Sequence, residues 1–253
     1  MFALVHSLTL NGIEAVPVQV EVDVQNGLPC FELVGLPSAS IREAKERVRS
    51  AIKNSGFEFP LQRITVNLAP ADLRKEGSHL DLPIALGILL ASRQVSALPG
   101  ELFWIGELSL EGTIKGVPGV LPMIMALSRN FPRAKAIIPA ANQAEASLVD
   151  YPSLMAQSLK DVVSFLDGEL DLLKTEVANV SVLPGAYQED FSDIKGQASA
   201  KRAIEVAVAG GHNILLLGPP GSGKTMLARR IPSIMPEMSR QEILDTTQIY
   251  SVA

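Results

Sequence analysis

The sequence predicts an α/β protein made of two domains joined by a linker. Three observations support this. Apolar patterns typical of strands and helices alternate over residues 1–168, the patterns weaken over residues 169–189, and a glycine-rich run between an apolar strand and a helix follows. The length of 253 residues also exceeds the common size of one domain. We therefore expect an α+β domain over residues 1–168, a linker over residues 169–189 and a truncated α/β domain over residues 190–253.

Composition indicates a globular protein. Hydrophobic residues make up 47% of the chain and charged residues 19%, which suits a chain that buries a full core. The formal net charge of -5 gives no general attraction to nucleic acid, so a nucleic-acid partner would have to meet a local basic patch. Cys30 is the only cysteine, which excludes an internal disulfide bond and a cysteine-based metal cluster.

No segment has the features of a membrane anchor. The N-terminal run MFALVHSLTL lacks the basic region of a signal peptide. Apolar runs such as residues 84–91 fall short of the ~18 residues that span a bilayer. We therefore expect a cytoplasmic protein with no membrane partner.

The first domain is expected to open with a β-meander. Residues 13–24 alternate apolar and polar side chains like a half-buried strand, and an Asn-Gly turn signal separates them from a second strand over residues 29–36. Ser38 or Ser40 then caps a helix whose apolar residues recur at helical spacing. This stripe, which should face a core, consists of Ile41, Ala44, Val48, Ala51 and Ile52.

A second stripe on the same helix is basic. Its cationic side chains could meet the phosphates of DNA. The alternative is a solvated face that Glu43 and Glu46 partly neutralise, because charged stripes usually face water. This basic stripe consists of Arg42, Lys45, Arg49 and Lys53.

Strands and helices then alternate to the end of the first domain. A strongly apolar helix over residues 80–92 must hold Pro83 in its first turn, where proline is tolerated. Tight turns are expected at Gly112, Gly116 and Gly119. The other predicted strands are residues 61–68, 102–106, 134–139 and 154–159, and the other predicted helices are residues 121–130, 141–148 and 161–166.

The second domain contains the most specific pattern in the chain. A helix over residues 197–209 and a buried strand over residues 213–217 precede the run GPPGSGKT, and another helix starts from Gly223. A strand, a glycine-rich loop and a helix in this order are typical of the phosphate-binding loop of ATP- and GTP-using domains. The predicted phosphate loop consists of Gly218, Pro219, Pro220, Gly221, Ser222, Gly223, Lys224 and Thr225.

Each residue type in the phosphate loop suits a polyphosphate. Successive backbone N–H groups leading into a helix meet negative charge, and glycines let the backbone approach the phosphates closely. Lys224 supplies an ammonium group for the β- and γ-phosphates, and the hydroxyl of Thr225 is suited to ligate Mg²⁺. We therefore predict that a nucleoside triphosphate and Mg²⁺ bind here.

Hydrolysis requires further groups. An acidic residue at the end of a later strand must hold Mg²⁺ and polarise water, and an arginine usually comes from a neighbouring subunit. The acidic residues after the loop, Glu237, Glu242 and Asp245, lie in polar, helix-like sequence. We therefore expect no catalytic residue in this chain and negligible ATP hydrolysis by the chain alone.

Residues 190–230 resemble the AAA+ ATPases of the magnesium-chelatase-like group and, within it, the YifB/ComM family of bacterial proteins. In AAA+ proteins the segment equivalent to residues 193–197 lies against the adenine. The resemblance therefore implies ATP, and it assigns Ile194, Gly196 and Gln197 to contacts with the base. An ordinary turn at the start of a helix remains the alternative for these residues.

Most of residues 62–166 resemble the proteolytic domain of Lon. The run ADLRKEGSHLDLPIAL is similar to the loop that carries the nucleophilic serine of that family, and IGELSLEGTIKGVPGVLPMIMAL is similar to the segment that carries its lysine. His79 stands at the serine position and Leu121 at the lysine position. Since the activated serine needs its base, the catalytic dyad is absent.

Ser78 lies one residue from the position of the missing nucleophile. With Lys75 or Lys115 as base it could replace that nucleophile, but a displaced serine would lose the oxyanion geometry that acyl transfer requires. The alternative is a structural role in which Ser78 caps a helix, Asp81 completes the capping box and His79 is exposed in the first turn.

The YifB/ComM resemblance implies an ATP-driven motor that forms a homo-oligomeric ring. It further implies action on single-stranded or branched DNA during natural transformation, as a helicase or branch-migration motor. A chelatase- or chaperone-type motor that acts on a protein partner is the alternative. An ATP-dependent serine protease is disfavoured by the missing dyad.

Overall fold

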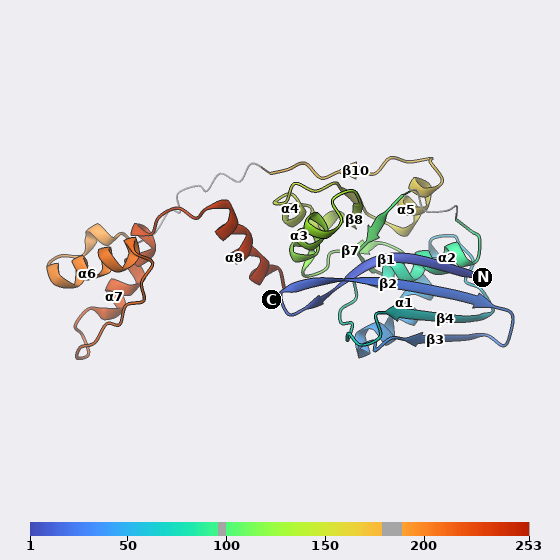
Figure 1. Ribbon diagram of the computed structural model, residues 1–253, viewed down its shortest axis with the longest axis horizontal. Helices are drawn as coiled ribbons and strands as arrows, with labels where there is room; N and C mark the ends of the chain where they lie inside the picture. The colour runs from blue at the N-terminus through green and yellow to red at the C-terminus, as the bar shows by residue number, and fades with distance from the viewer. Residues whose placement is uncertain (96–99, 179–188, 253) are drawn as a thin grey trace. The chain divides into compact units, whose positions relative to one another are not determined.

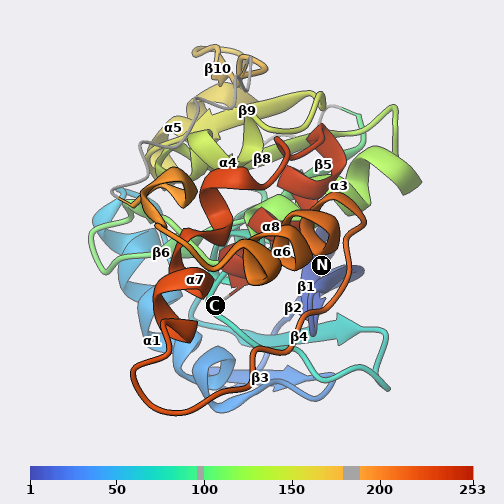
Figure 2. The same cartoon turned by 90° about the vertical axis from the view of Figure 1, so that its left-hand side faces the viewer.

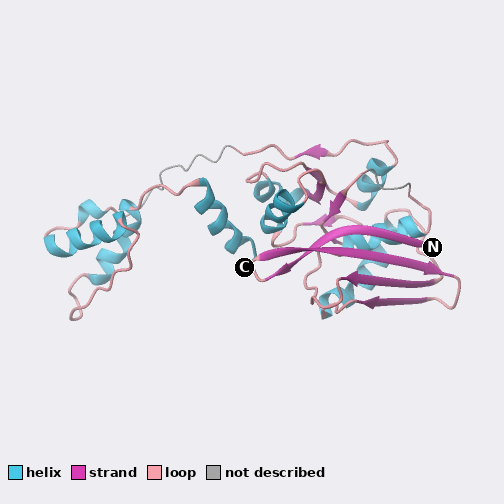
Figure 3. Ribbon diagram, viewed as in Figure 1, coloured by secondary structure: helices cyan, strands magenta, loops and turns pink. Residues whose placement is uncertain are grey.

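The computed structural model describes residues 1–95, 100–178 and 189–252 (Figure 1). The chain forms two compact units. The first contains Met1–Asn179 together with Leu244–Ala253, and the second contains Val180–Ile243. Among the described residues, every strand belongs to the first unit, which is an α/β structure (Figure 3).

A mixed sheet of eight strands forms the centre of the first unit. Strand β1 (Phe2–Asn11) pairs antiparallel with β2 (Glu14–Gln25), and β2 pairs antiparallel with β4 (Arg63–Ala69). The order across the sheet is β10-β9-β8-β5-β1-β2-β4-β3, and Figure 2 shows β3 near one edge and β10 at the other. The remaining strands are β3 (Cys30–Val34), β5 (Leu102–Trp104), β8 (Lys135–Pro139), β9 (Ser153–Ala156) and β10 (Leu173–Lys174).

Two cores cover the two faces of the sheet. Successive side chains of a strand point to opposite faces, and along β5 the buried Trp104 belongs to one core and the buried Phe103 to the other. Helices α1, α2 and α5 contribute to the core of Trp104, and α3 contributes to the core of Phe103. The helices of this unit include α1 (Ala39–Asn54), α2 (Asp81–Ala91), α3 (Val120–Asn130), η1 (Ala140–Asn142), α4 (Gln143–Ala146) and α5 (Leu159–Leu166).

Helix α2 is the most deeply buried helix of the first unit. Its residues Ile84, Leu86, Ile88 and Leu89 are fully buried, because the helix contacts β1 and β2 as well as α1. A helix that is apolar all round is stable only in such an interior position. Pro83 lies in the first turn, as the sequence predicts.

Gly87 lets α2 approach the sheet closely. A Cβ atom added at Gly87 would lie 2.4 Å from Cγ2 of Val22 on β2. We therefore expect Gly87→Ala to lower the free energy of unfolding by about 1–3 kcal/mol, despite the better helix propensity of alanine. Urea unfolding checks this, with Gly27→Ala as control because its Cβ would lie 3.8 Å from Cβ of Arg63. Equal stability of the two variants would contradict the prediction.

The predicted β-meander is wrong. Strand β3 does not pair with β2; it pairs in parallel with β4, which lies between them. The chain passes from β3 through α1 to β4, and a parallel pair needs such a crossover. Buried side chains explain the order: Ile64, Val66 and Leu68 of β4 are fully buried, whereas Phe31 and Leu33 of β3 are half-buried.

The periodicity of residues 2–11 does not predict β1, although this strand lies between β2 and β5. Polar residues obscure its apolar pattern, because Ser7 and Thr9 are buried together with Val5 and Leu8. The hydroxyl of Ser7 donates a hydrogen bond to the carbonyl oxygen of Trp104 at 2.7 Å, which satisfies it in the interior. The buried polar residues Ser7 and Thr9 thus hide a central strand from pattern analysis.

Most of the other predicted elements of the first unit are confirmed. Strand 154–159 is shorter than predicted, since β9 ends at Ala156 and α5 begins at Leu159. The short hairpin of β6 (Glu107–Leu108) and β7 (Ile114–Lys115) is not predicted. In the predicted linker 169–189, Leu173–Lys174 pairs with β9, and residues 179–188 lie outside the described residues.

The second unit is small and helical. Helices α6 and α7 pack around a core of Phe191, Ile194, Ile204 and Leu227. The helical elements are η2 (Phe191–Asp193), α6 (Ala198–Ala209), α7 (Lys224–Arg230) and η3 (Ile231–Ile234), and α8 (Arg240–Val252) begins in this unit.

The predicted buried strand over residues 213–217 is wrong. This segment is a loop in Figure 3, and Leu215 and Leu217 are 79% and 83% exposed. A buried strand must satisfy its backbone groups through paired strands. The described residues 189–243 contain no other strand with which this segment could pair.

Candidate nucleotide-binding site

The phosphate loop leads directly into helix α7. Gly223 is the N-cap of α7 with φ 84°, and Gly221 has φ 81°. Both values lie in the left-handed region, which glycine adopts without the steric cost of a Cβ atom. The glycines at these two positions therefore allow the turn that the loop makes before the helix.

Lys224 crosses the phosphate loop. Its Nζ atom donates hydrogen bonds to the carbonyl oxygens of Gly218 and Pro219, both at 2.8 Å, and to Oγ of Ser222 at 3.3 Å. Hydrogen bonds from a charged donor are stronger than neutral ones, so the lysine holds the two ends of the loop together. The ammonium group consequently lies against the loop predicted to bind phosphates.

The segment predicted to contact adenine also meets the phosphate loop. Nε2 of Gln197 donates a hydrogen bond to the carbonyl oxygen of Ser222 at 3.0 Å. Gly196 and Gln197 have φ 73° and φ 57°, so the chain turns sharply just before α6. The structure thus joins residues that are far apart in the sequence but predicted to share one site.

Ile194 is a core residue. Its side chain is 3% exposed and packs with Phe191, Ile204 and Leu227, and its carbonyl oxygen accepts a hydrogen bond from Nζ of Lys201 at 3.1 Å. The contact of Ile194 with adenine, like those of Gly196 and Gln197, stays a prediction.

A hollow of about 360 Å³ adjoins the start of α7. Lys224 and Thr225 line it together with apolar side chains that include Leu216 and Ile231. The loop is closely packed at Gly218, where an added Cβ atom would lie 2.9 Å from Oγ of Ser222. The binding of a nucleotide and Mg²⁺ by these residues stays a prediction. Pro219 and Pro220 are exposed beside them.

The residues compared with the Lon dyad have other partners. The Ser78 hydroxyl donates a hydrogen bond to the carboxylate of Glu107. Lys75 is fully buried, and its Nζ donates to the carbonyl oxygens of Gly35, at 3.1 Å, and Pro70. Burial lowers the pKa of this amine. Neither side chain serves the other as nucleophile or base in this arrangement.

The structural roles expected for Ser78, His79 and Asp81 are wrong in detail. The N-cap of α2 is Leu80, so Ser78 does not cap the helix. His79 is 3% exposed rather than exposed in a first turn. Asp81 is bound by Arg47 of α1 instead of completing a capping box. At the position of the Lon lysine, Leu121 is fully buried.

Arg47 and Asp81 form a two-point ion pair between α1 and α2. Nε and Nη2 of Arg47 lie 2.7 and 3.1 Å from the two carboxylate oxygens of Asp81, and the N–H of Leu108 donates to the same carboxylate at 3.3 Å. Asp81 is 1% exposed. Burial raises the pKa of Asp81 to about 6, although the bonds from Arg47 oppose the rise. No sequence pattern singles out this pair.

His79 makes the stability of the first unit depend on pH. Nε2 of its buried ring donates to the carbonyl oxygen of Leu8 at 2.8 Å, and burial lowers the pKa of His79 to about 4 from 6.5. A lowered folded-state pKa adds stability above the unfolded value, and this stability is lost as pH falls from 6.5 to 4. We expect the wild type to lose roughly 3 kcal/mol relative to His79→Gln over that range. Urea unfolding at several pH values measures the difference, and parallel pH profiles would contradict it.

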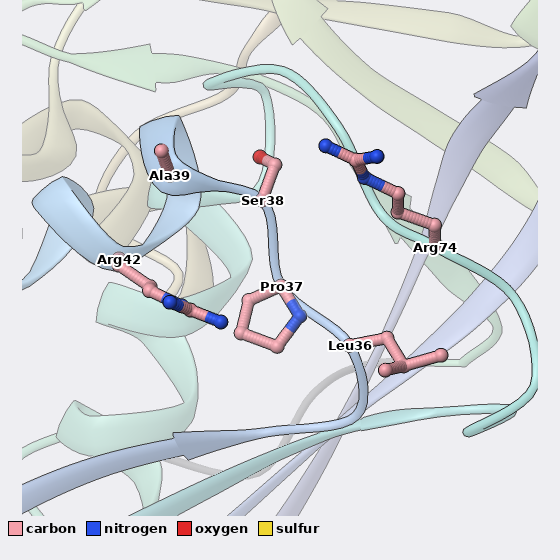
Figure 4. A pocket seen from close by; sticks show the side chains of 6 residues that line it. All are labelled: Leu36, Pro37, Ser38, Ala39, Arg42 and Arg74. Carbon is pink, nitrogen blue, oxygen red and sulfur yellow. The ribbon is translucent and has the colours of Figure 1, made fainter.

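The basic stripe is only partly a solvated face. Arg42 and Lys53 are exposed, but Lys45 and Arg49 are half-buried. Arg42 lines a hollow of about 320 Å³ with Arg74, which comes from the loop after β4, and Figure 4 shows these two side chains on either side of Pro37 and Ser38. Arg74 is not among the predicted contacts, because nothing in the sequence indicates that its loop reaches α1.

Comparison with known proteins agrees with these observations. Residues 20–142 match the family described as subunit ChlI of Mg-chelatase, and residues 190–253 match the family described as magnesium chelatase, subunit ChlI. These two matches define a magnesium-chelatase-like protein of the AAA+ ATPase type, a class that in general uses a nucleotide and Mg²⁺. The described residues contain no helix long and apolar enough to cross a membrane.

Individual relatives narrow the class. Competence protein ComM of Haemophilus influenzae is 48% identical over 255 residues, which cover 99% of this chain and 50% of that protein. Uncharacterized protein YifB of Escherichia coli is 43% identical over 252 residues, which cover 99% of this chain and 49% of that protein. The chain belongs to the YifB/ComM family. It spans about half the length of the curated relatives it matches.

Proposed function

We propose that this chain binds ATP and Mg²⁺ through its phosphate loop and forms part of a ring-shaped motor that acts on DNA. The proposal rests on hydrogen bonds that two side chains donate to the same glycine-rich loop. Lys224 donates to the carbonyl oxygens of Gly218 and Pro219, and Gln197 donates to that of Ser222. The competence named for the Haemophilus relative supports a role in natural transformation, by helicase or branch-migration activity on single-stranded or branched DNA.

Each residue of the site has a role in this proposal. Backbone N–H groups of residues 221–224 bind the phosphates, Lys224 neutralises their charge, and Thr225 holds Mg²⁺. Gln197 holds the loop through its hydrogen bond to the carbonyl oxygen of Ser222. When bound, the nucleotide supplies the phosphoanhydride bond whose hydrolysis drives a motor of this class.

The chain alone is expected to turn over ATP negligibly. Among the acidic residues after the loop, Glu242 accepts hydrogen bonds from the backbone and hydroxyl of Ser239, both at 2.7 Å, so it stabilises the start of α8. This use of Glu242 supports the view that Glu242 is not the carboxylate that holds Mg²⁺.

We propose that the first unit is a Lon-like domain without proteolytic activity, in line with the domain boundaries 1–168, 169–189 and 190–253. The bond from Ser78 to Glu107 and the burial of Lys75 support this. Degradation of casein by the full-length protein, lost in Ser78→Ala, would show that this part of the proposal is wrong.

The deciding experiment measures ATP hydrolysis by the full-length protein with linear, single-stranded and four-way-junction DNA. We expect DNA to bind in a salt-dependent manner and to stimulate hydrolysis. Absence of DNA binding at low salt would contradict the proposal. Stimulation by a co-purified protein and not by DNA would instead favour the chaperone- or chelatase-type motor.

A further inference from the structure

A second hollow lies further along α1, beside the edge strand β3. It has a volume of about 100 Å³ and is lined by residues of β3, of α1 and of the segment before β4. We call it the edge cleft. Its principal lining residues are Phe31, Lys45, Arg49, Phe59, Leu61 and Gln62.

Two aromatic rings and a guanidinium group form the centre of the edge cleft. The rings of Phe31 and Phe59 are stacked, with centroids 6.3 Å apart and planes inclined by 26°. Cζ of Arg49 lies 5.8 Å from the centroid of Phe59. Both phenylalanines are half-buried rather than enclosed in the core. Flat aromatic faces beside an arginine are the arrangement on which bases of single-stranded nucleic acid stack.

The charge of the cleft is entirely positive. Among the described residues that line it, the charged ones are Lys45 and Arg49. Along the same helix, Arg42 lines the hollow of Figure 4 with Arg74, and the rise from residue 42 to residue 49 is about 10 Å. The two hollows therefore share one cationic helix. Acidic neighbours are exposed around them: Glu43 and Glu46 on α1, Glu32 paired with Arg63 and Glu76 paired with Arg74.

We propose that the edge cleft binds single-stranded DNA, with a base against Phe31 and Phe59 and backbone phosphates on the basic stripe. This inference rests on the proposed function and assigns a DNA site to the first unit. Since β3 is an edge strand, a peptide or second copy of the chain could instead pair with its backbone. The charged side chains that line the cleft, Lys45 and Arg49, are both cations and favour a polyanion over that occupant.

Fluorescence tests whether a base reaches the cleft. The chain has a single tryptophan, Trp104, which is fully buried and gives a constant background. In full-length Phe59→Trp, oligo(dT) is expected to quench the added emission with the same midpoint as DNA binding measured by anisotropy. Binding without any change in this emission would overturn the proposal.

Affinity measurements test the aromatic and cationic parts separately. Phe59→Leu should weaken oligo(dT) binding by roughly 10-fold, while Phe59→Tyr should keep it, because stacking needs the ring. Arg49→Gln should lower the slope of log affinity against log salt by about one. The matched control is Arg133→Gln, which removes an exposed arginine between α3 and β8 and should leave the slope unchanged.

The outcomes separate this inference from the function on which it rests. If DNA stimulates ATP hydrolysis but Phe59→Leu and Arg49→Gln bind oligo(dT) like the wild type, the edge cleft is not the site and the motor function stands. If the wild type does not bind DNA, both fail. If Phe59→Leu changes only the oligomeric state, the cleft is a subunit contact and the inference is wrong. Phe59→Trp keeps the test valid should Phe59→Leu fold poorly.

Discussion

Lys224→Ala is expected to abolish ATP turnover by the full-length protein. The ammonium group of Lys224 bonds Gly218 and Pro219 across the phosphate loop, so its loss removes both the charge for the phosphates and a clamp on the loop. A hydrogen bond to a charged group contributes about 1.5–3 kcal/mol. Two such bonds from the ammonium group to the β- and γ-phosphates would be lost in Lys224→Ala, which should weaken nucleotide binding by at least about 100-fold. Binding of a fluorescent ATP analogue and steady-state hydrolysis measure the two effects.

The control removes a cation elsewhere in the same unit. Arg202 is exposed on α6, and in the part of the chain that the structure describes it pairs with Glu205, at 3.3 Å and three residues away. Such surface pairs contribute little, so Arg202→Ala should bind and hydrolyse ATP like the wild type. Turnover by Lys224→Ala within a few-fold of this control would refute the role given to the lysine.

Arg47→Ala is expected to destabilise the first unit strongly. It leaves the carboxylate of Asp81 buried without its partner, and breaking a buried ion pair costs about 3–5 kcal/mol. Arg47 itself is 24% exposed, which favours the lower end of this range. Urea unfolding gives the loss directly. The control, Arg63→Ala, breaks the exposed pair with Glu32 and should cost less than about 1 kcal/mol.

The deficit of Arg47→Ala should depend on pH with a defined sign. Burial already raises the pKa of Asp81 to about 6, above its ordinary value of 3.8, and Arg47 opposes that rise. Without the arginine the folded-state pKa must rise further, and a raised pKa means that stability is lost as pH rises through it. The deficit relative to the wild type should therefore be largest near pH 8 and shrink towards pH 5. A constant deficit would contradict the pairing.

The spacing of apolar residues predicts single helices and strands well, but it predicts poorly which strands pair with one another. Helix α2 and the amphipathic face of α1 follow from apolar spacing, since burial on all sides or on one side leaves a direct trace in the sequence. The pairing of β3 leaves no such trace. An Asn-Gly turn signal predicts a hairpin with β2, but the half-buried side chains of β3 suit an edge position beside β4. Pairing is decided by competition among distant strands.

In the candidate site, too, the sequence predicts the motif residues but not the contacts that the tertiary structure makes. The motif GPPGSGKT identifies Lys224 and the glycines because the chemistry of phosphate binding requires those residue types at that spacing. The bond from Gln197 to Ser222 is consistent with the family resemblance, and no spacing rule reveals it. The tertiary structure alone brings Phe31 to Phe59 and Arg47 to Asp81. The sequence around each of these residues therefore does not reveal its partner.

The exposed run at residues 214–217 affects how the protein should be handled. Leucine side chains without strand partners, flanked by unpaired backbone groups, form a template for association with other chains. At the concentrations used for crystallisation, the 253-residue chain should therefore self-associate through this segment and bind the dye ANS. Low protein concentration and added osmolyte would be the practical remedy.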